Sequence, residues 1–188
     1  MKSVLVAASV FLALFTGCRN TDVTKPTAVP TAAAHAPKSE TLTPYYYGLI
    51  EEYRTILAED PSNLAAITAL GNAYFDSGQW REAVRMYQRA LELVPRNADV
   101  LTDMGTAYRN MGRPDRAREE FRRALSFEPG HVNARYNLGV VYAYDFKDYE
   151  RAIYYWEDLL RIAPNHPQAD TIRMAIAAFK KARKKDDQ

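Results

Sequence analysis

The feature that most constrains this chain is a repeat of 34 residues in its central part. Glycines recur at this interval in three successive segments, and so do the tyrosines that follow them: Gly71, Gly105 and Gly139, then Tyr74, Tyr108 and Tyr142. Four further pairs keep the same interval: Ala83 and Ala117, Tyr87 and Phe121, Ala90 and Ala124, and Pro95 and Pro129. Because so many positions recur in register, one small structural unit must be repeated along the chain.

The spacing within each unit resembles that of the tetratricopeptide repeat, and the resemblance implies that each unit is a pair of helices. The glycine allows the first helix to approach the second closely, and the tyrosine lies on the same helical face. The alanine of the second helix is small because the two helices cross there, and the aromatic residue after it packs beside the crossing. The proline ends the second helix. Gly78 and Gly112 fall in the turn within a unit, where glycine permits a positive φ. The chain is therefore expected to be all-α.

These residues and their spacing resemble the tetratricopeptide repeat over nearly all of residues 64–166. The resemblance implies a right-handed superhelical solenoid of antiparallel helix pairs, with repeats at residues 64–97, 98–131 and 132–166. Each repeat would bury its apolar face against its neighbours. The chain depends on such packing because it has a single cysteine and hence no internal disulfide.

The third repeat departs from this pattern. One extra residue lies between Tyr142 and Ala152 compared with the earlier repeats, the turn has no glycine, and Pro164 comes one place late. The segment from Tyr144 to Tyr149 is therefore expected to form an unusual aromatic turn. Such a turn either packs onto the next helix or forms an exposed contact patch.

Helices are also expected on both sides of the repeats. Four residues continue the repeat phase backwards from the first repeat: Leu49, Tyr53, Ile56 and Pro61. Residues 44–63 are therefore interpreted as a degenerate half-repeat that contains one helix. Near the C-terminus, four apolar residues recur at helical spacing: Ala169, Ile172, Ile176 and Phe179. Residues 167–188 are interpreted as a capping helix followed by a basic tail.

The N-terminus has the features of a bacterial lipoprotein-type signal peptide at residues 1–17. After Lys2, the apolar run from Val4 to Phe15 is about a dozen residues long, which suits a signal-peptide core and is shorter than the ~20 residues that span a bilayer. The run ends in Phe15-Thr16-Gly17-Cys18, which resembles a lipobox with phenylalanine in place of the usual leucine. The resemblance implies that Cys18 receives the lipid and becomes the new N-terminus.

Two alternatives to lipidation remain open: an uncleaved anchor followed by a chance cysteine, or cleavage by another peptidase. Arg19, where the enteric sorting rule would place aspartate to retain the protein in the inner membrane, favours the outer membrane. Residues 18–43 are rich in threonine, alanine and proline, and are expected to form a disordered linker after the anchor. The folded part would then face the periplasm, clear of the lipid surface.

In the tetratricopeptide-repeat family, ligands usually lie in a concave groove lined by the first helix of each repeat. Applied to this chain, the pattern assigns nine groove residues: Thr68, Asn72, Phe75, Thr102, Thr106, Arg109, Tyr136, Val140 and Tyr144. They describe a mildly polar groove with aromatic residues, suited to an extended peptide or a docked helix. The family's chaperone clamp for acidic C-termini is not matched, because only Asn72 fits and Asp103 would repel a carboxylate.

The sequence contains no motif of a catalytic, metal or cofactor site. It has no Gly-rich phosphate loop, HExxH, CxxC or GxSxG pattern, and no cofactor is expected. The three histidines, His35, His131 and His166, are interpreted as solvated residues of the linker and of turns between repeats. A net charge of +2 gives no reason to expect a nucleic-acid partner.

Taken together, these features predict a non-enzymatic adaptor that is lipid-anchored, faces the periplasm and binds other proteins, with a possible place in the assembly of an envelope complex. The alternative is a self-associating structural scaffold whose groove holds another copy of the chain. A role like that of the pilotins of type IV pili is less favoured, because that family carries more repeats.

Overall fold

The computed structural model describes residues 43–186. The predicted signal peptide, Cys18 and all but the last residue of the predicted linker lie outside this part of the chain. The described residues form eight α-helices and one π-helical turn: α1 (Thr43–Glu59), α2 (Leu64–Asp76), α3 (Trp80–Leu93), α4 (Ala98–Asn110), α5 (Pro114–Phe127), α6 (Val132–Val140), η1 (Val141–Asp145), α7 (Tyr149–Ile162) and α8 (Ala169–Asp186). Because residues 43–186 contain no strand, the all-α prediction is confirmed.

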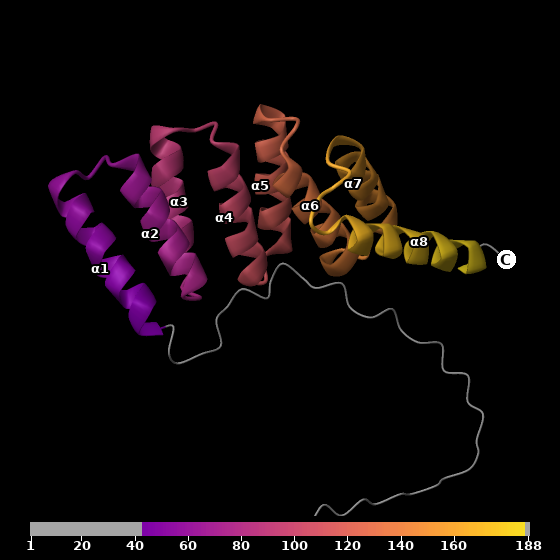
Figure 1. Ribbon diagram of the computed structural model, residues 1–188, viewed down its shortest axis with the longest axis horizontal. Helices are drawn as coiled ribbons and strands as arrows, with labels where there is room; N and C mark the ends of the chain where they lie inside the picture. The colour runs from indigo at the N-terminus through magenta and orange to yellow at the C-terminus, as the bar shows by residue number, and fades with distance from the viewer. Residues whose placement is uncertain (1–42, 187–188) are drawn as a thin grey trace, which may run out of the picture.

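Helices α1 to α7 follow one another in one curved row, and α8 runs across the end of this row (Figure 1). The pairs α2–α3, α4–α5 and α6–α7 form the three repeats, and each pair also contacts the next, through α3 with α4 and through α5 with α6. Helix α1 packs on α2 at one end of the row, and α8 packs on α7 at the other. This arrangement is the predicted solenoid of helix pairs with a flanking helix on each side.

Each repeat is closed by a glycine that lies against an aromatic ring of its partner helix. A Cβ added to Gly71 would lie 2.8 Å from Cε1 of Tyr87, and one added to Gly105 would lie 2.5 Å from Cε1 of Phe121. Real Cβ atoms do not approach other atoms so closely, so a side chain at either position would require the ring or the helix that carries it to shift. The recurring glycine and aromatic residue in the sequence are therefore the two halves of one recurring packing contact.

The first helix of each repeat begins with a side-chain cap, which also recurs every 34 residues. The side chains of Asn63 and Asn97 accept a hydrogen bond from a backbone N–H in the first turn of α2 and α4. His131 does the same for α6, since its Nδ1 accepts from the N–H of Ala134 at 3.1 Å. These caps satisfy donors that a helix start leaves without a partner.

The interpretation of His131 as a solvated turn residue is wrong. Its side chain is 5% exposed, and its Nε2 lies 3.0 Å from Oδ1 of Asp99. Because Nδ1 accepts the capping hydrogen bond, Nε2 carries the ring proton and donates a hydrogen bond to the carboxylate of Asp99. His166 is half-buried rather than fully solvated, with its ring 5.5 Å from the ring of Tyr136.

The extra residue of the third repeat is accommodated in the π-helical turn η1. In the first repeat, the N–H of Gln79 bonds to the carbonyl of Tyr74, five residues earlier. In the third, the N–H of Asp148 bonds to the carbonyl of Tyr142, which occupies the same place in the repeat but is six residues earlier. A π-helical turn holds one more residue than an α-helical turn, so the hydrogen bond that ends the helix is kept despite the insertion.

Lys147 takes the place of the turn glycine in the third repeat. Gly78 and Gly112 have φ values of 78° and 71°, and Lys147 has a φ of 59°. Glycine adopts this left-handed conformation freely, whereas a residue with a Cβ does so at a cost of about 1–2 kcal/mol. The sequence correctly indicated an unusual turn here, but gave no sign that lysine would adopt the backbone conformation of glycine.

The two end helices each bury one apolar face. In α1, Ile50 and Leu57 are buried against the first repeat, and in α8, Ile172 and Ile176 are buried against the third. No helix within residues 43–186 is both long and apolar enough to cross a membrane.

Candidate functional site

The nine predicted groove residues all lie on α2, α4, α6 or η1, the first helices of the three repeats, and we call them together the first-helix face. They differ in how far they are accessible. Asn72 is exposed, and five others are half-buried: Thr68, Phe75, Thr106, Arg109 and Tyr144. The accessible part of the face therefore lies mainly on α2 and α4.

Three members of the face are buried, so their assignment to a binding surface is corrected. Thr102 is 4% exposed, and its hydroxyl donates to the carbonyl of Ala98 within its own helix. Tyr136 is 8% exposed and its ring lies against His166. Val140 is 1% exposed. Helical spacing correctly places these residues in one line with the others. It does not show which of these side chains are covered by the third repeat or by the segment before α8.

Asn72 is held in place by the core beneath it. Its side-chain oxygen accepts a hydrogen bond from the hydroxyl of Tyr87 at 2.9 Å, and Tyr87 is the ring that packs on Gly71. Burial, and then the charges of Asp103 and Asp76, raise the pKa of Tyr87, so its hydroxyl stays protonated and available as the donor. The exposed amide of Asn72 is therefore presented to solvent in a fixed orientation.

Asp103 gives the second repeat a titratable group near this face. Burial, assisted by the negative charges of Asp99 and Asp76 and opposed by His131, raises the pKa of Asp103 to about 6. The first and third repeats have Ala69 and Asn137 at the same place. The sequence identifies Asp103 only as a carboxylate that would repel an acidic ligand, and its burial becomes visible only in the fold.

Arg109 joins the second repeat to the third. Its Nε donates to Oδ2 of Asp145 at 2.6 Å, and the two side chains are 13% and 25% exposed. Burial raises the pKa values of Tyr136 and Tyr144, and the nearby charge of Arg109 opposes this shift in both. Asp145 was not among the predicted site residues, and its only signal in the sequence is the extra residue that moves it into this place.

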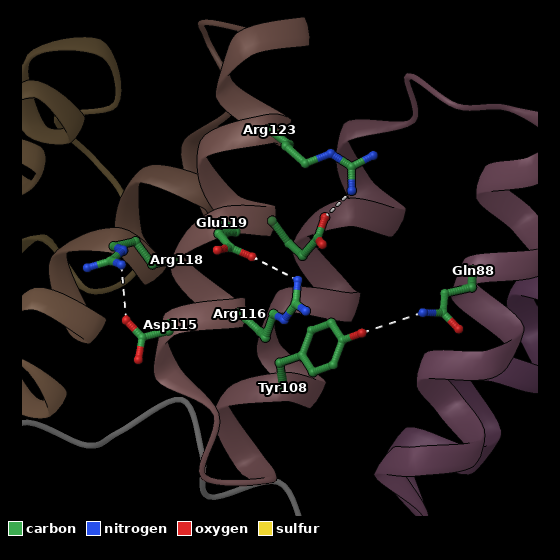
Figure 2. A network of polar contacts seen from close by, with 8 residues as sticks. Gln88, Tyr108, Asp115, Arg116, Arg118, Glu119 and Arg123 are labelled. Atoms are coloured by element: carbon green, nitrogen blue, oxygen red, sulfur yellow. Dashed lines mark hydrogen bonds and ion pairs between the residues drawn. The ribbon is translucent and has the colours of Figure 1, made fainter.

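The second helices carry a different polar surface, shown in Figure 2. Along α5, three arginines pair with acidic residues one turn away: Arg116 with Glu119, Arg118 with Asp115, and Arg123 with Glu120. Most of these side chains are well exposed, and such pairs contribute about 0–1 kcal/mol each. We therefore interpret this surface as a solvated helix face rather than a site. Within residues 43–186, no group of three or more histidine, cysteine, aspartate or glutamate side chains could hold a metal ion.

Two family models match this chain. A tetratricopeptide repeat model matches residues 102–167, and a TPR repeat model matches residues 71–112. A solved structure described as the crystal structure of MamA has a TM-score of 0.62 and 23% identity, over 78% of this chain and 92% of that chain. Another, MamA 41-end from Desulfovibrio magneticus RS-1, has a TM-score of 0.61 and 15% identity, over 68% and 71%. These likenesses show a shared fold. No curated protein matches the chain.

Proposed function

We propose that the protein is a non-enzymatic adaptor that binds other proteins through the first-helix face, because residues 71–167 match tetratricopeptide repeat models. The observation that carries this proposal is the accessible stretch of the face on α2 and α4. There, Asn72 is exposed and Thr68, Phe75 and Thr106 are half-buried, and Asn72 is held by a hydrogen bond from the buried Tyr87. Hydroxyl, amide and aromatic groups on a rigid surface suit a peptide segment or a docked helix.

The adaptor acts, in this proposal, from the surface of a membrane in the cell envelope. The support is the apolar run before Cys18 and its likeness to a lipobox, which would give the chain a lipid anchor. With more than one acyl chain on Cys18, anchoring would be stable. The outer membrane is favoured over the inner one because Arg19 follows the cysteine. The binding role would then be the assembly or recruitment of proteins at the periplasmic side.

Site-specific crosslinking in cells tests the binding role. A photo-reactive amino acid at Thr68, which is half-buried on α2, is expected to capture a distinct protein. The same amino acid at Glu92, exposed on α3, is the matched control, because it lies on a second helix outside the first-helix face. If both positions capture the same proteins, or neither captures any, the first-helix face is not the binding surface.

Fractionation tests the anchor separately. The wild-type chain is expected in the membrane fraction, and Cys18→Ala is expected in the soluble or a mislocalised fraction with unchanged helical content by circular dichroism. Membrane association that survives Cys18→Ala would refute lipidation and leave the binding role untouched.

A self-associating scaffold is the alternative function, in which another copy of the chain occupies the first-helix face. A role like that of the pilotins is a less favoured form of the adaptor. Size-exclusion chromatography with light scattering distinguishes the first two functions. A monomer at micromolar concentration supports the adaptor, whereas an oligomer that dissociates when Asn72 or Thr106 is changed to a large charged residue supports the scaffold.

A further inference from the structure

The third repeat differs from the other two in the turn between its helices. When Ala143 is taken as the inserted residue, this turn aligns residue by residue with the turns of the earlier repeats. Four third-repeat residues then have clear counterparts in the first and second repeats: Tyr144 with Phe75 and Arg109, Asp145 with Asp76 and Asn110, Phe146 with Ser77 and Met111, and Lys147 with Gly78 and Gly112. The turn keeps its backbone shape but presents a new pair of side chains to the second repeat.

Two contacts from this turn reach back to the second repeat. The carboxylate of Asp145 accepts a hydrogen bond from Nε of Arg109 on α4 at 2.6 Å. The ring of Phe146 lies 4.7 Å from the guanidinium carbon of Arg118 on α5, a cation–π contact. One contact is therefore made to each helix of the second repeat. Because the side chains of Arg109 and Asp145 are only 13% and 25% exposed, this ion pair is screened by salt less than the more exposed pairs along α5.

No matching pair of contacts can form between the first and second repeats. The counterpart of Arg109 is Phe75 and the counterpart of Asp145 is Asn110, so no ion pair is possible there. The counterpart of Arg118 is Val84, which cannot make a cation–π contact. The inserted residue, the π-helical turn and the two arginine contacts thus occur together in the third repeat. Single π-helical turns in α-helices are frequent at functional sites.

We propose that this turn is a latch, in which Asp145 and Phe146 hold Arg109 and Arg118, fix the third repeat to the second, and keep Arg109 from a partner until the latch opens. Arg109 belongs to the first-helix face, so a partner that uses this guanidinium must compete with Asp145 for it. That last step depends on the proposed binding function, whereas the latch itself does not. Opening requires only that the turn around Asp145 moves, while the packing of Gly139 on Trp156 stays intact.

Chemical labelling of arginine on the full chain tests the latch without a partner. Phenylglyoxal modifies accessible guanidinium groups, and mass spectrometry gives the rate at each arginine. In the wild-type chain Arg109 is expected to react much more slowly than Arg116, whose side chain is 61% exposed. Asp145→Asn is expected to raise the rate at Arg109 by about fivefold or more, and to speed hydrogen exchange in residues 141–149.

The matched control is Asp170→Asn, which removes an exposed partner from Arg173 and should leave the rate at Arg109 unchanged. A second variant removes the inserted residue, by deletion of Ala143 together with Lys147→Gly. It restores the spacing of the earlier repeats and is also expected to release Arg109. The latch is refuted if Arg109 is as reactive as Arg116 in the wild-type chain, or if Asp145→Asn leaves its rate unchanged. A deletion variant that fails to fold, or keeps Arg109 protected, also counts against the proposal.

The labelling result is independent of the crosslinking at Thr68. A protected Arg109 that Asp145→Asn releases, with no protein captured at Thr68, would support the latch and refute the binding function. Capture at Thr68 without any effect of Asp145→Asn on labelling would support the binding function and refute the latch.

Discussion

The second and third repeats are built on the same packing contact but differ in how tightly it is held. In the second, a Cβ added to Gly105 would lie 2.5 Å from the ring of Phe121; in the third, one added to Gly139 would lie 2.1 Å from Nε1 of Trp156. The larger ring leaves less room, and the turn between the two helices of the third repeat is longer by one residue. A repeat can therefore keep its core while its turn acquires new contacts.

The largest effect is expected from substitution of the glycine that packs on Trp156, where the third repeat has the least room. Gly139→Ala should lower the free energy of unfolding by about 2–3 kcal/mol through overpacking, more than Gly71→Ala, because Trp156 cannot move aside. Its Nε1 donates to the carbonyl of Tyr136 at 3.2 Å, and its ring stacks on Phe179 at 6.2 Å. Urea unfolding followed by circular dichroism measures both variants. Equal losses would show that the third repeat adapts as easily as the first.

A second effect concerns the carboxylate of Asp103, which has uncharged counterparts, Ala69 and Asn137, in the other two repeats. The pKa of Asp103 is raised to about 6 from an ordinary value of 3.8, so the folded chain binds this proton more tightly than the unfolded chain does. Asp103 therefore does not lower the free energy of unfolding below about pH 4, where it is protonated in both states. The loss of stability grows as the pH rises from about 4 to 6, and it remains constant at higher pH.

Asp103→Asn should accordingly raise the free energy of unfolding by about 1–2 kcal/mol at pH 7.5 and have little effect at pH 4. Unfolding by urea at several pH values measures the difference between variant and wild type. Asp115→Asn is the control, since that carboxylate is exposed on α5 and pairs with Arg118. If the two variants show the same dependence on pH, burial of Asp103 is not the cause.

The side-chain caps at the start of α2, α4 and α6 are a feature that all three repeats share, unlike the turns. His131→Ala should lower the free energy of unfolding by about 1 kcal/mol, as should Asn97→Ala, because each removes the acceptor for one N–H at the start of a helix. His131→Asn should restore most of the loss, which can be followed by thermal unfolding. Failure of asparagine to restore it would mean that the contact of His131 with Asp99, rather than the cap, stabilises α6.

The sequence was sufficient for the fold because its repeat marks the packing contacts directly. Gly71, Gly105 and the aromatic rings they contact are visible as a period, and the helices follow from it. The cap at His131 was missed, although it lies 34 residues after Asn97, because histidine is not a usual capping residue. Accessibility of the first-helix face was beyond prediction, since Tyr136 and Val140 share a helical line with Asn72 and only tertiary packing covers them.

The smallest expected effect concerns the backbone that carries the extra residue. Lys147→Gly should raise the free energy of unfolding by about 0.5–1 kcal/mol, because glycine relieves the left-handed strain but makes the unfolded chain more flexible. Gly112→Lys should lower it by about 1–2 kcal/mol at the same φ, and chemical unfolding of both variants measures the pair. If Lys147→Gly is neutral while Gly112→Lys is costly, the longer turn of the third repeat has removed the need for glycine. If both changes are neutral, the turn glycines are not what shapes these repeats, and the resemblance of Lys147 to Gly112 has no energetic basis.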